Sequence, residues 1–240
     1  MIDWKRTQAN LKVTADGIPG EVTWTALLRV IASPKAKPAA LTTMARVLRT
    51  FGEPIADLSS PARVAGYVSN TGNETGGFAD FDENLNYSAE RMAEVWPSRY
   101  RGADGKPNAK ARALANSPVA FANDVYGARM GNELDGTNDN DGYDFRGLGP
   151  LATTGYNNFL AAERLTGIPF STQPGLMADP GIGTLGALAW WAQSGINAWL
   201  DKGNPTAARS VANAGHPNVA KPEGIETVLR YNAALLKVLA

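Results

Sequence analysis

Apolar side chains recur at the spacing of one face of an α-helix through most of this chain. In one well-marked set the members are three or four residues apart: Val64, Tyr67, Val68 and Thr71. Ser60-Pro61 precedes this set, and it combines a helix-capping serine with a proline suited to the first turn. Gly76-Gly77 follows it and is a typical helix end. The pattern therefore predicts a helix that begins at Pro61 and stops at the glycine pair.

Further helices are predicted by the same spacing, at residues 88–96, 109–126, 155–166 and from about Glu223 onward. Asp179-Pro180 is a second start signal, and it opens a stretch without charged residues that runs to Leu200. That stretch is long enough to span a bilayer, but its four glycines and several polar side chains favour a buried central helix. Alternation typical of strands is rare, and residues 81–87 are predicted as a short extended arm. The predicted fold class is mainly α.

A stretch rich in proline, alanine and lysine, residues 33–40, is typical of a short linker. It separates a small unit, residues 1–32, from a larger one, residues 41–240. Residues 1–49 hold eight basic and three acidic side chains, a net charge of +5, whereas the whole chain has no net charge. A basic end favours docking to an anionic polymer, although an ordinary solvated surface explains it equally well. Basic and aromatic residues are not interleaved, so no nucleic-acid partner is expected.

The composition limits which side chains can form a catalytic or metal site. Of the 240 residues 44% are apolar and 19% are charged, which is enough to bury a sizeable core. There is no cysteine and a single histidine, His216, so disulfides, cysteine-based zinc sites and Cys–His nucleophiles are excluded. The acid-rich stretch 135–142 lacks two ligand positions of a calcium-binding loop. No metal or other cofactor is expected, and carboxylates are the candidate working groups.

Glu74 and Glu83 are nine residues apart and lie on either side of Gly76-Gly77. Glu74 is predicted in the last turn of a helix, where the negative end of the helix dipole favours the protonated form of a carboxyl group. A carboxyl group that keeps its proton near neutral pH can act as a general acid. The glycine pair can fold the chain back, so that both carboxyl groups face one cleft, as cleavage of a glycosidic bond requires. Spacing alone leaves open that they are capping or surface glutamates.

Six longer motifs occur along the larger unit: Glu74-Thr-Gly-Gly-Phe78, Glu83-Asn-Leu-Asn-Tyr-Ser-Ala89, Val125-Tyr-Gly-Ala-Arg-Met-Gly-Asn132, Tyr143-Asp-Phe-Arg-Gly-Leu-Gly-Pro150, Thr154-Gly-Tyr-Asn-Asn158 and Asn213-Ala-Gly215. In this order they resemble glycoside hydrolase family 19, the plant-type chitinases and related phage endolysins. The resemblance covers about residues 41–240 and is greatest to the cysteine-free, short-looped endolysin branch. It implies a lysozyme-like helical glycosidase domain.

The resemblance also implies a role for each matched residue. Glu74 takes the position of the general acid, and Glu83 that of the general base that activates water. Thr154 takes the position of the residue that helps to hold this water. Four more residues fall on substrate-binding or cleft positions: Tyr87, Arg146, Asn158 and Asn213. The local alternatives are a core residue for the tyrosine, a helix cap for Asn158 and a turn residue for Asn213.

The chain departs from the family pattern at several positions. Asn73 stands where the family often has a histidine before the acid, and Asn213-Ala-Gly215 replaces Asn-Gly-Gly. Leu148 and Ala152 replace an arginine and a substrate-facing glutamine, and Thr227 stands where an arginine is expected. Both carboxylates are kept. The departures therefore bear on substrate choice and efficiency more than on the class of reaction.

Residues 1–32 resemble a second family, through Thr7-Gln-Ala-Asn-Leu11, Ala15-Asp-Gly-Ile-Pro-Gly20, Thr23 and Ala26-Leu27. These are similar to the peptidoglycan-binding family 1 repeat, in which an Asp-Gly-x-x-Gly turn joins short helices. The stretch covers about half of the usual module, and a plain linker turn is the alternative. The resemblance implies a small helical unit that binds the bacterial cell wall.

Together these resemblances imply an endolysin, a muramidase that hydrolyses β-1,4 bonds of peptidoglycan by an inverting acid/base mechanism. Its expected partner is peptidoglycan, and it is expected to be a monomer without stable membrane insertion. The segment Met1-Ile-Asp-Trp-Lys5 lacks a signal-peptide pattern, so we expect the host cytoplasm as its location and a separate pore as its route to the wall. The alternatives are a chitinase, a lytic transglycosylase and a non-catalytic wall-binding or virion protein.

Overall fold

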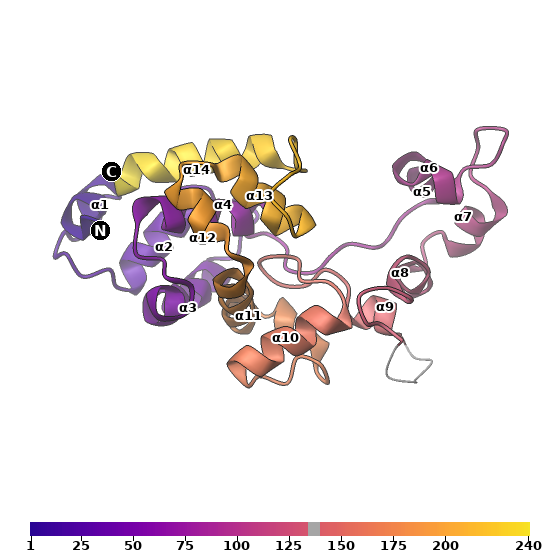
Figure 1. Cartoon of the computed structure of the whole chain (residues 1–240), viewed down its shortest axis with the longest axis horizontal. Coiled ribbons are helices and arrows are strands. Elements are labelled where there is room, and N and C mark those ends of the chain that lie inside the picture. Colours follow the sequence, from indigo (N-terminus) through magenta and orange to yellow (C-terminus); the bar gives the residue numbers. More distant parts are fainter. Residues whose placement is uncertain (134–139) are drawn as a thin grey trace.

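The computed structural model describes residues 1–133 and 140–240 (Figure 1). Its helices are α1 (Trp4–Asn10), α2 (Glu21–Arg29), α3 (Pro38–Ala56), α4 (Pro61–Glu74), α5 (Ala89–Val95), α6 (Pro97–Tyr100), α7 (Ala109–Leu114), α8 (Pro118–Tyr126), α9 (Asp141–Asp144), α10 (Tyr156–Thr166), the 3-10 helix η1 (Pro174–Ala178), α11 (Pro180–Ser194), α12 (Ile196–Asp201), α13 (Pro205–Ala214) and α14 (Ile225–Leu239). The described residues form no strand, only isolated bridges. The mainly α prediction is confirmed. Most of the acid-rich stretch 135–142 lies outside the described residues.

The start signals in the sequence act as predicted. The side chain of Ser60 accepts a hydrogen bond from a backbone amide in the first turn of α4, and that of Asp179 accepts two in the first turn of α11. Helix α4 ends at Glu74. Gly76 and Gly77 follow with φ of 57° and 74°, the left-handed region that favours glycine. The glycine pair thus fixes the place at which Glu74 leaves the helix.

Two of the predicted helices are broken. Residues 109–126 form α7 and α8, because Asn116 adopts a φ of 55° and Pro118 begins a new helix. The uncharged stretch is divided at Gly195, whose φ is 70°. The predicted extended arm forms no strand in the described part of the chain, and Asp82 meets Leu148 in an isolated bridge.

The buried side chains form three clusters. The largest joins α2, α3, α4, α11 and α14, and in it α3 packs against both α2 and α11 while α4 packs against α14. A second cluster lies among α5, α6, α7 and α8, and a third around α10 and η1. In Figure 1 the chain leaves the end of α4 and crosses to α5 on the other side of the molecule. This crossing segment, residues 75–88, contains Glu83.

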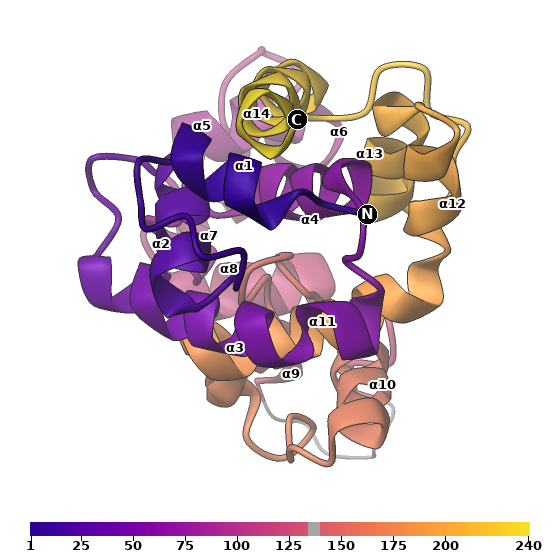
Figure 2. The same ribbon diagram turned by 90° about the vertical axis from the view of Figure 1, so that its left-hand side faces the viewer.

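The N-terminal residues pack onto the largest cluster. Trp24, Leu27 and Leu28 of α2 are buried in it, and α1 crosses α14 near the C-terminal end of that helix (Figure 2). In the predicted linker the backbone N–H of Ser33 donates to the carbonyl of Gly77 at 2.8 Å, and the last three linker residues already belong to α3. Residues 1–32 are therefore held against the larger unit and not on a free tether.

The Asp-Gly-Ile-Pro-Gly turn between α1 and α2 is organised by a buried glutamine. The side-chain amide of Gln8 donates to Asp16 Oδ1 at 2.8 Å, and its carbonyl accepts from the N–H of Gly17 at 2.7 Å. The backbone N–H of Ile18 and the Gln8 amide hold the pKa of Asp16 below its ordinary value. This part of the motif serves to fold the turn. Whether the unit binds the wall stays a prediction.

The uncharged helix α11 is central, as predicted. Leu188 and Trp191 are fully buried against its neighbours, and the indole N–H of Trp191 donates to Asn197 Oδ1 at 2.9 Å. No helix among residues 1–133 and 140–240 has both the length and the apolar character needed to cross a membrane.

Candidate active site

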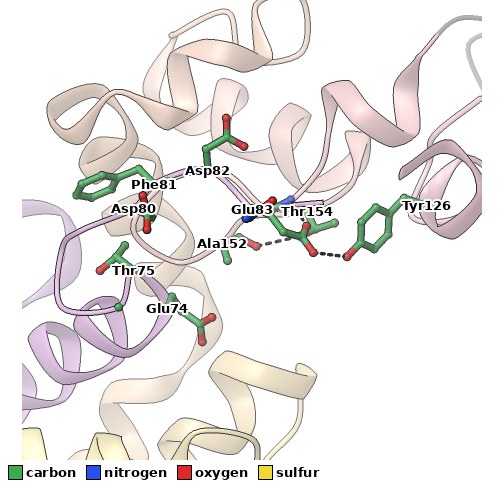
Figure 3. Close-up of a pocket in the computed structure, with 13 residues that line it drawn as sticks. Glu74, Thr75, Asp80, Phe81, Asp82, Glu83, Tyr126, Ala152 and Thr154 are labelled. Atoms are coloured by element: carbon green, nitrogen blue, oxygen red, sulfur yellow. Dashed lines mark hydrogen bonds between the residues drawn. The ribbon is translucent and has the colours of Figure 1, made fainter. Parts of the chain in front are cut away.

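A cavity of about 720 Å³, here called the central cavity, opens where the chain crosses from α4 to α5. Its acidic lining residues are Glu74, Asp80, Asp82 and Glu83. In Figure 3 the side chain of Glu74 projects from the end of α4, and Glu83 lies across from it beside Thr154 and Tyr126. The structure thus brings the two predicted catalytic carboxylates to one cavity from different elements.

Glu74 is paired with an arginine that we did not predict. Arg209, on α13, has only 2% of its side chain exposed, and its guanidinium donates to Glu74 Oε1. Its Nε also donates to the carbonyl of Glu223 at 2.7 Å, which fixes the guanidinium plane. The ion pair therefore ties the end of α4 to α13 and fixes the position of the Glu74 carboxyl group.

The sequence held a weak signal for Arg209. It lies four residues before Asn213, so on a helix both side chains share a face. The helix α13 was not predicted, although Ala207, Ala208 and Val211 recur in it at helical spacing. That spacing was the signal that could have indicated the helix.

Glu83 is held by three groups. Its backbone N–H donates to the carbonyl of Gly147 at 2.9 Å, and the N–H of Gly147 donates back to Glu83 Oε2 at 3.1 Å. The hydroxyl of Tyr126, at the end of α8, donates to Glu83 Oε1 at 3.0 Å. Burial, together with the nearby charge of Glu83, raises the pKa of Tyr126. The phenol therefore keeps its proton and remains a donor to the carboxylate.

Tyr126 belongs to a motif that the sequence comparison singled out, but its role was not predicted. Tyr126 and Glu83 are 43 positions apart. No local pattern links a tyrosine at the end of one helix to a glutamate in an earlier loop. The contact exists because the crossing segment, residues 75–88, runs past the end of α8.

Thr154 lies close to Glu83, as the resemblance implies. A Cβ placed on Gly147 would lie 3.1 Å from Glu83 Oε2 and 3.5 Å from Thr154 Oγ1, so both side chains face the same glycine. The Thr154 hydroxyl donates to the carbonyl of Ala152 at 2.9 Å, which leaves its oxygen lone pairs toward the cavity that it lines. A water between Thr154 and Glu83 would have an acceptor on each side.

Arg146 is engaged within the protein. Its guanidinium makes two hydrogen bonds of 2.6 Å to the carboxylate of Asp82, and Nη1 donates to the carbonyl of Tyr143 at 2.8 Å. It also lies over the ring of Tyr143, 4.1 Å from the centroid. These contacts fix the residue next to Glu83. The predicted contact of Arg146 with substrate stays a prediction.

Tyr87 lies near Glu83, as predicted, and its ring is also part of the core, which was the local alternative. Its ring packs against Trp96 and Phe121, with centroids 5.3 and 5.1 Å apart, in the second core cluster. Burial and the nearby charge of Glu83 raise its pKa. The residue is thus a neighbour of the base whose ring is used for packing.

Two smaller hollows adjoin the central cavity. One, of about 240 Å³, shares Asp80, Phe81 and Asp82 with it. The other, here called the side pocket, has a volume of about 480 Å³ and shares Ala152 and Thr154 with it. The three hollows therefore form one extended groove across the site.

The side pocket brings together both predicted asparagines, Asn158 of α10 and Asn213 of α13. The side-chain amide of Asn158 donates to the carbonyl of Thr154 at 2.7 Å, and Asn213 Oδ1 accepts from the N–H of Glu223 at 3.3 Å. Each asparagine has further donor or acceptor capacity for a ligand. The contacts of Asn158 and Asn213 with substrate stay predictions.

The two main departures from the family pattern lie in different environments. Leu148 is fully buried in the third core cluster, so its side chain does not face the groove. Ala152 lines both the central cavity and the side pocket, with a φ of 47°. Ala152 thus lies where the two hollows meet. Among the described residues no group of three or more His, Cys, Asp or Glu side chains is placed to hold a metal ion.

No protein-family model matches the chain. Over 101 residues it is 30% identical to a protein of Haemophilus influenzae (strain ATCC 51907 / DSM 11121 / KW20 / Rd) described as a glycosyl hydrolase family 19 domain-containing protein. The matched region is 42% of this chain and 47% of the relative, so the chain spans about half the length of the curated relative it matches.

Several solved chitinase structures are similar to this chain over more than nine-tenths of its length. Chitinase C from Streptomyces griseus HUT6037 gives a TM-score of 0.55 at 16% identity, covering 92% of this chain and 76% of that one. A bacterial family 19 chitinase gives 0.53 at 15% identity, covering 93% and 95%. A family 19, class IV chitinase from Zea mays gives 0.52 at 14% identity, covering 92% of both. The predicted lysozyme-like helical fold is confirmed, and the local sequence similarity supports a relationship to glycoside hydrolase family 19.

Proposed function

We propose that this protein is a glycoside hydrolase that cleaves β-1,4 bonds of peptidoglycan with Glu74 as general acid and Glu83 as general base. The observation that carries the proposal is the pair of carboxylates that face the central cavity from different elements, each with its own hydrogen-bond partners. Two such carboxyl groups across an extended groove suit the hydrolysis of a polymeric sugar. The fold shared with chitinases supports the same class of reaction.

The proposed mechanism is a single displacement. Glu74 gives its proton to the departing glycosidic oxygen as the bond to the anomeric carbon breaks, and water attacks that carbon from the opposite face. Glu83 takes a proton from this water, and the Thr154 hydroxyl orients it. Arg209 stabilises the negative charge that develops on Glu74 as its proton leaves. The products are a free hydroxyl on one fragment and a reducing end on the other.

Peptidoglycan is favoured over chitin by two features of the sequence. The motifs are most similar to the endolysin branch, and the N-terminal region is basic while peptidoglycan is anionic. The proposed role is that of a monomeric endolysin, which acts from the host cytoplasm and reaches the wall through a separate pore. Chitin is the second candidate substrate, because the solved structures of this fold named above are chitinases.

The test is to incubate the purified protein with purified peptidoglycan in water enriched in oxygen-18 and to analyse the products by mass spectrometry. We expect soluble fragments with one label at a reducing muramic acid end. Glu83→Gln is expected to lose this product while keeping its melting temperature. Glu90→Gln is the matched control, because Glu90 is an exposed glutamate in the first turn of α5.

The other products would each contradict the proposal in a different way. Anhydro ends without label would identify a lytic transglycosylase, which needs no water-activating base. Cleavage of chitin without cleavage of peptidoglycan would identify a chitinase. Binding to walls without any new fragment would identify a non-catalytic protein.

The wall-binding role of residues 1–32 is part of the same proposal. Its test is the pair Arg6→Gln and Lys12→Gln, at exposed positions on and after α1. The double variant is expected to sediment less with purified walls while hydrolysing soluble glycan fragments at the rate of the parent protein. Unchanged sedimentation would remove the docking role of this surface.

A further inference from the structure

The side pocket differs in charge from the central cavity. Four acidic side chains line the central cavity, whereas no acidic side chain among the described residues lines the side pocket. Its one charged lining residue is Arg129. The groove therefore changes from negative to positive within the length that one polymer chain would occupy.

Arg129 is exposed and is held on a well-fixed turn. Its backbone N–H donates to the carbonyl of Tyr126 at 3.0 Å, and its own carbonyl accepts from the N–H of Asn132 at 3.0 Å. Asn132 is buried and accepts from the N–H of Tyr156 at 2.8 Å, which ties the turn to α10. Within the described part of the chain the guanidinium of Arg129 has no ion-pair partner. Arg129 therefore lines the pocket from a fixed backbone position and has a guanidinium free to bind an anion.

The neighbours of Arg129 suit an amino sugar. Asn158 and Asn213 offer amide groups that can bind the N-acetyl and hydroxyl groups of a sugar, and Trp190 offers an apolar surface for the sugar ring. These groups serve chitin and peptidoglycan equally. The guanidinium discriminates, because chitin carries no carboxylate, whereas the lactyl-peptide substituent of N-acetylmuramic acid does.

We propose that Arg129 is a specificity-determining residue that binds the carboxylate of the lactyl-peptide substituent of a muramic acid seated in the side pocket. A planar guanidinium matches a carboxylate with two parallel hydrogen bonds. The inference deepens the proposed function and rests on it for the identity of the polymer. It explains how a fold shared with chitinases can prefer an anionic glycan.

The test measures binding apart from cleavage, by isothermal titration calorimetry in a Glu74→Gln background. The probes are a tetrasaccharide of alternating N-acetylglucosamine and N-acetylmuramic acid with free lactyl groups, the same tetrasaccharide with its stem peptides, and the N-acetylglucosamine tetramer. Arg129→Gln is expected to weaken binding of a charged probe roughly tenfold or more, the effect of one charge-assisted contact, and to leave the neutral tetramer unchanged. The lactyl carboxyl group is amidated where a stem peptide is attached, so loss with the stem-bearing probe would assign the contact to a peptide carboxylate, whether or not the free-lactyl probe also loses affinity. Loss confined to the free-lactyl probe would overturn the role of Arg129 in binding stem-bearing peptidoglycan.

Two further variants make the result specific. Arg129→Lys is expected to recover part of the affinity, because it keeps the charge but not the two-bond geometry. Arg164→Gln is the matched control, since Arg164 is an exposed arginine in the last turn of α10 that lines neither the central cavity nor the side pocket. It removes the same charge from the molecule and is expected to leave all three affinities unchanged.

The outcomes separate this inference from the proposed function. Equal affinities of Arg129→Gln and its parent for the charged probes, or an equal loss for charged and neutral probes, would overturn the role of Arg129. If the wild-type protein cleaves no polymer yet Arg129→Gln selectively weakens the charged probes, the hydrolase proposal fails and the specificity of the side pocket stands.

Discussion

At the scale of single residues, the two carboxylates of the central cavity are held by partners of different charge. Glu74 faces a buried guanidinium, whereas Glu83 accepts from a phenol and a backbone amide. In the proposed mechanism Glu74 becomes more negative as the bond breaks and Glu83 becomes less so. The cation lies beside the group that gains negative charge, which is where electrostatic stabilisation lowers the barrier.

We expect Arg209→Met to reduce kcat by at least about tenfold, because it removes a charge-assisted contact from Glu74 in a nearly buried position. KM should change less, since the arginine acts through Glu74 and not on the sugar. Steady-state kinetics on soluble glycan strands separate the two effects. Arg209→Lys should recover part of kcat, and a melting curve shows whether the fold survives. A variant with wild-type kcat would mean that the ion pair is dispensable for the reaction.

Gly147 is the residue around which Glu83 and Thr154 meet. We expect Gly147→Ala to lower kcat strongly, because the new methyl group would lie 3.1 Å from Glu83 Oε2 and take the space beside Thr154 Oγ1. Gly175→Ala is the matched control, since a Cβ there meets nothing within 4 Å. Activity and melting temperature are measured for both. Equal activities would show that the space in front of Gly147 is not used by the attacking water.

At the scale of elements, the end of α4 is supported by the N-terminal segment. The carbonyl of Gly77 accepts from Ser33, and a Cβ on Gly72 would lie 2.5 Å from Ile31 Cδ1. The helix that carries Glu74 and the chain that precedes α3 are thus in van der Waals contact. The position of the proposed general acid depends on a segment more than forty residues earlier in the sequence.

The glycine pair offers a direct test of this support. A side chain at Gly77 would be strained twice, by a φ of 74° and by a Cβ only 2.6 Å from the backbone nitrogen of Ser33. A side chain at Gly76 would be strained only by its φ of 57°, because no atom lies within 4 Å of the Cβ position. We expect Gly76→Ala to cost about 1 kcal/mol of stability and Gly77→Ala to cost clearly more and to reduce kcat. Chemical denaturation and kinetics measure both. Equal losses in the two variants would mean that the contact with Ser33 does not position Glu74.

At the scale of the whole molecule, the sequence allowed us to predict the features that depend on local interactions, such as where helices begin. Ser60 and Asp179 start their helices because their side chains act within one turn. The contact of Arg209 with Glu74 joins residues 135 positions apart. This contact could not be inferred, because no local rule places the middle of one helix beside the end of another. The catalytic pair itself was inferred from a motif resemblance, and spacing alone left it undecided.

The packing of residues 1–32 onto the largest core cluster leads to the last prediction. We expect a protein that lacks these residues to lose cooperative unfolding and hydrolysis together, because Trp24, Leu27 and Leu28 leave the core and Ile31 no longer packs beside Gly72 in α4. A tethered binding module would give the opposite result, a truncated protein that melts as before and still cleaves soluble glycans. Circular dichroism melting and the soluble-substrate assay distinguish the two. The exposed charges on and just after α1 can be changed without altering the core, so Arg6→Gln with Lys12→Gln tests wall binding where truncation cannot.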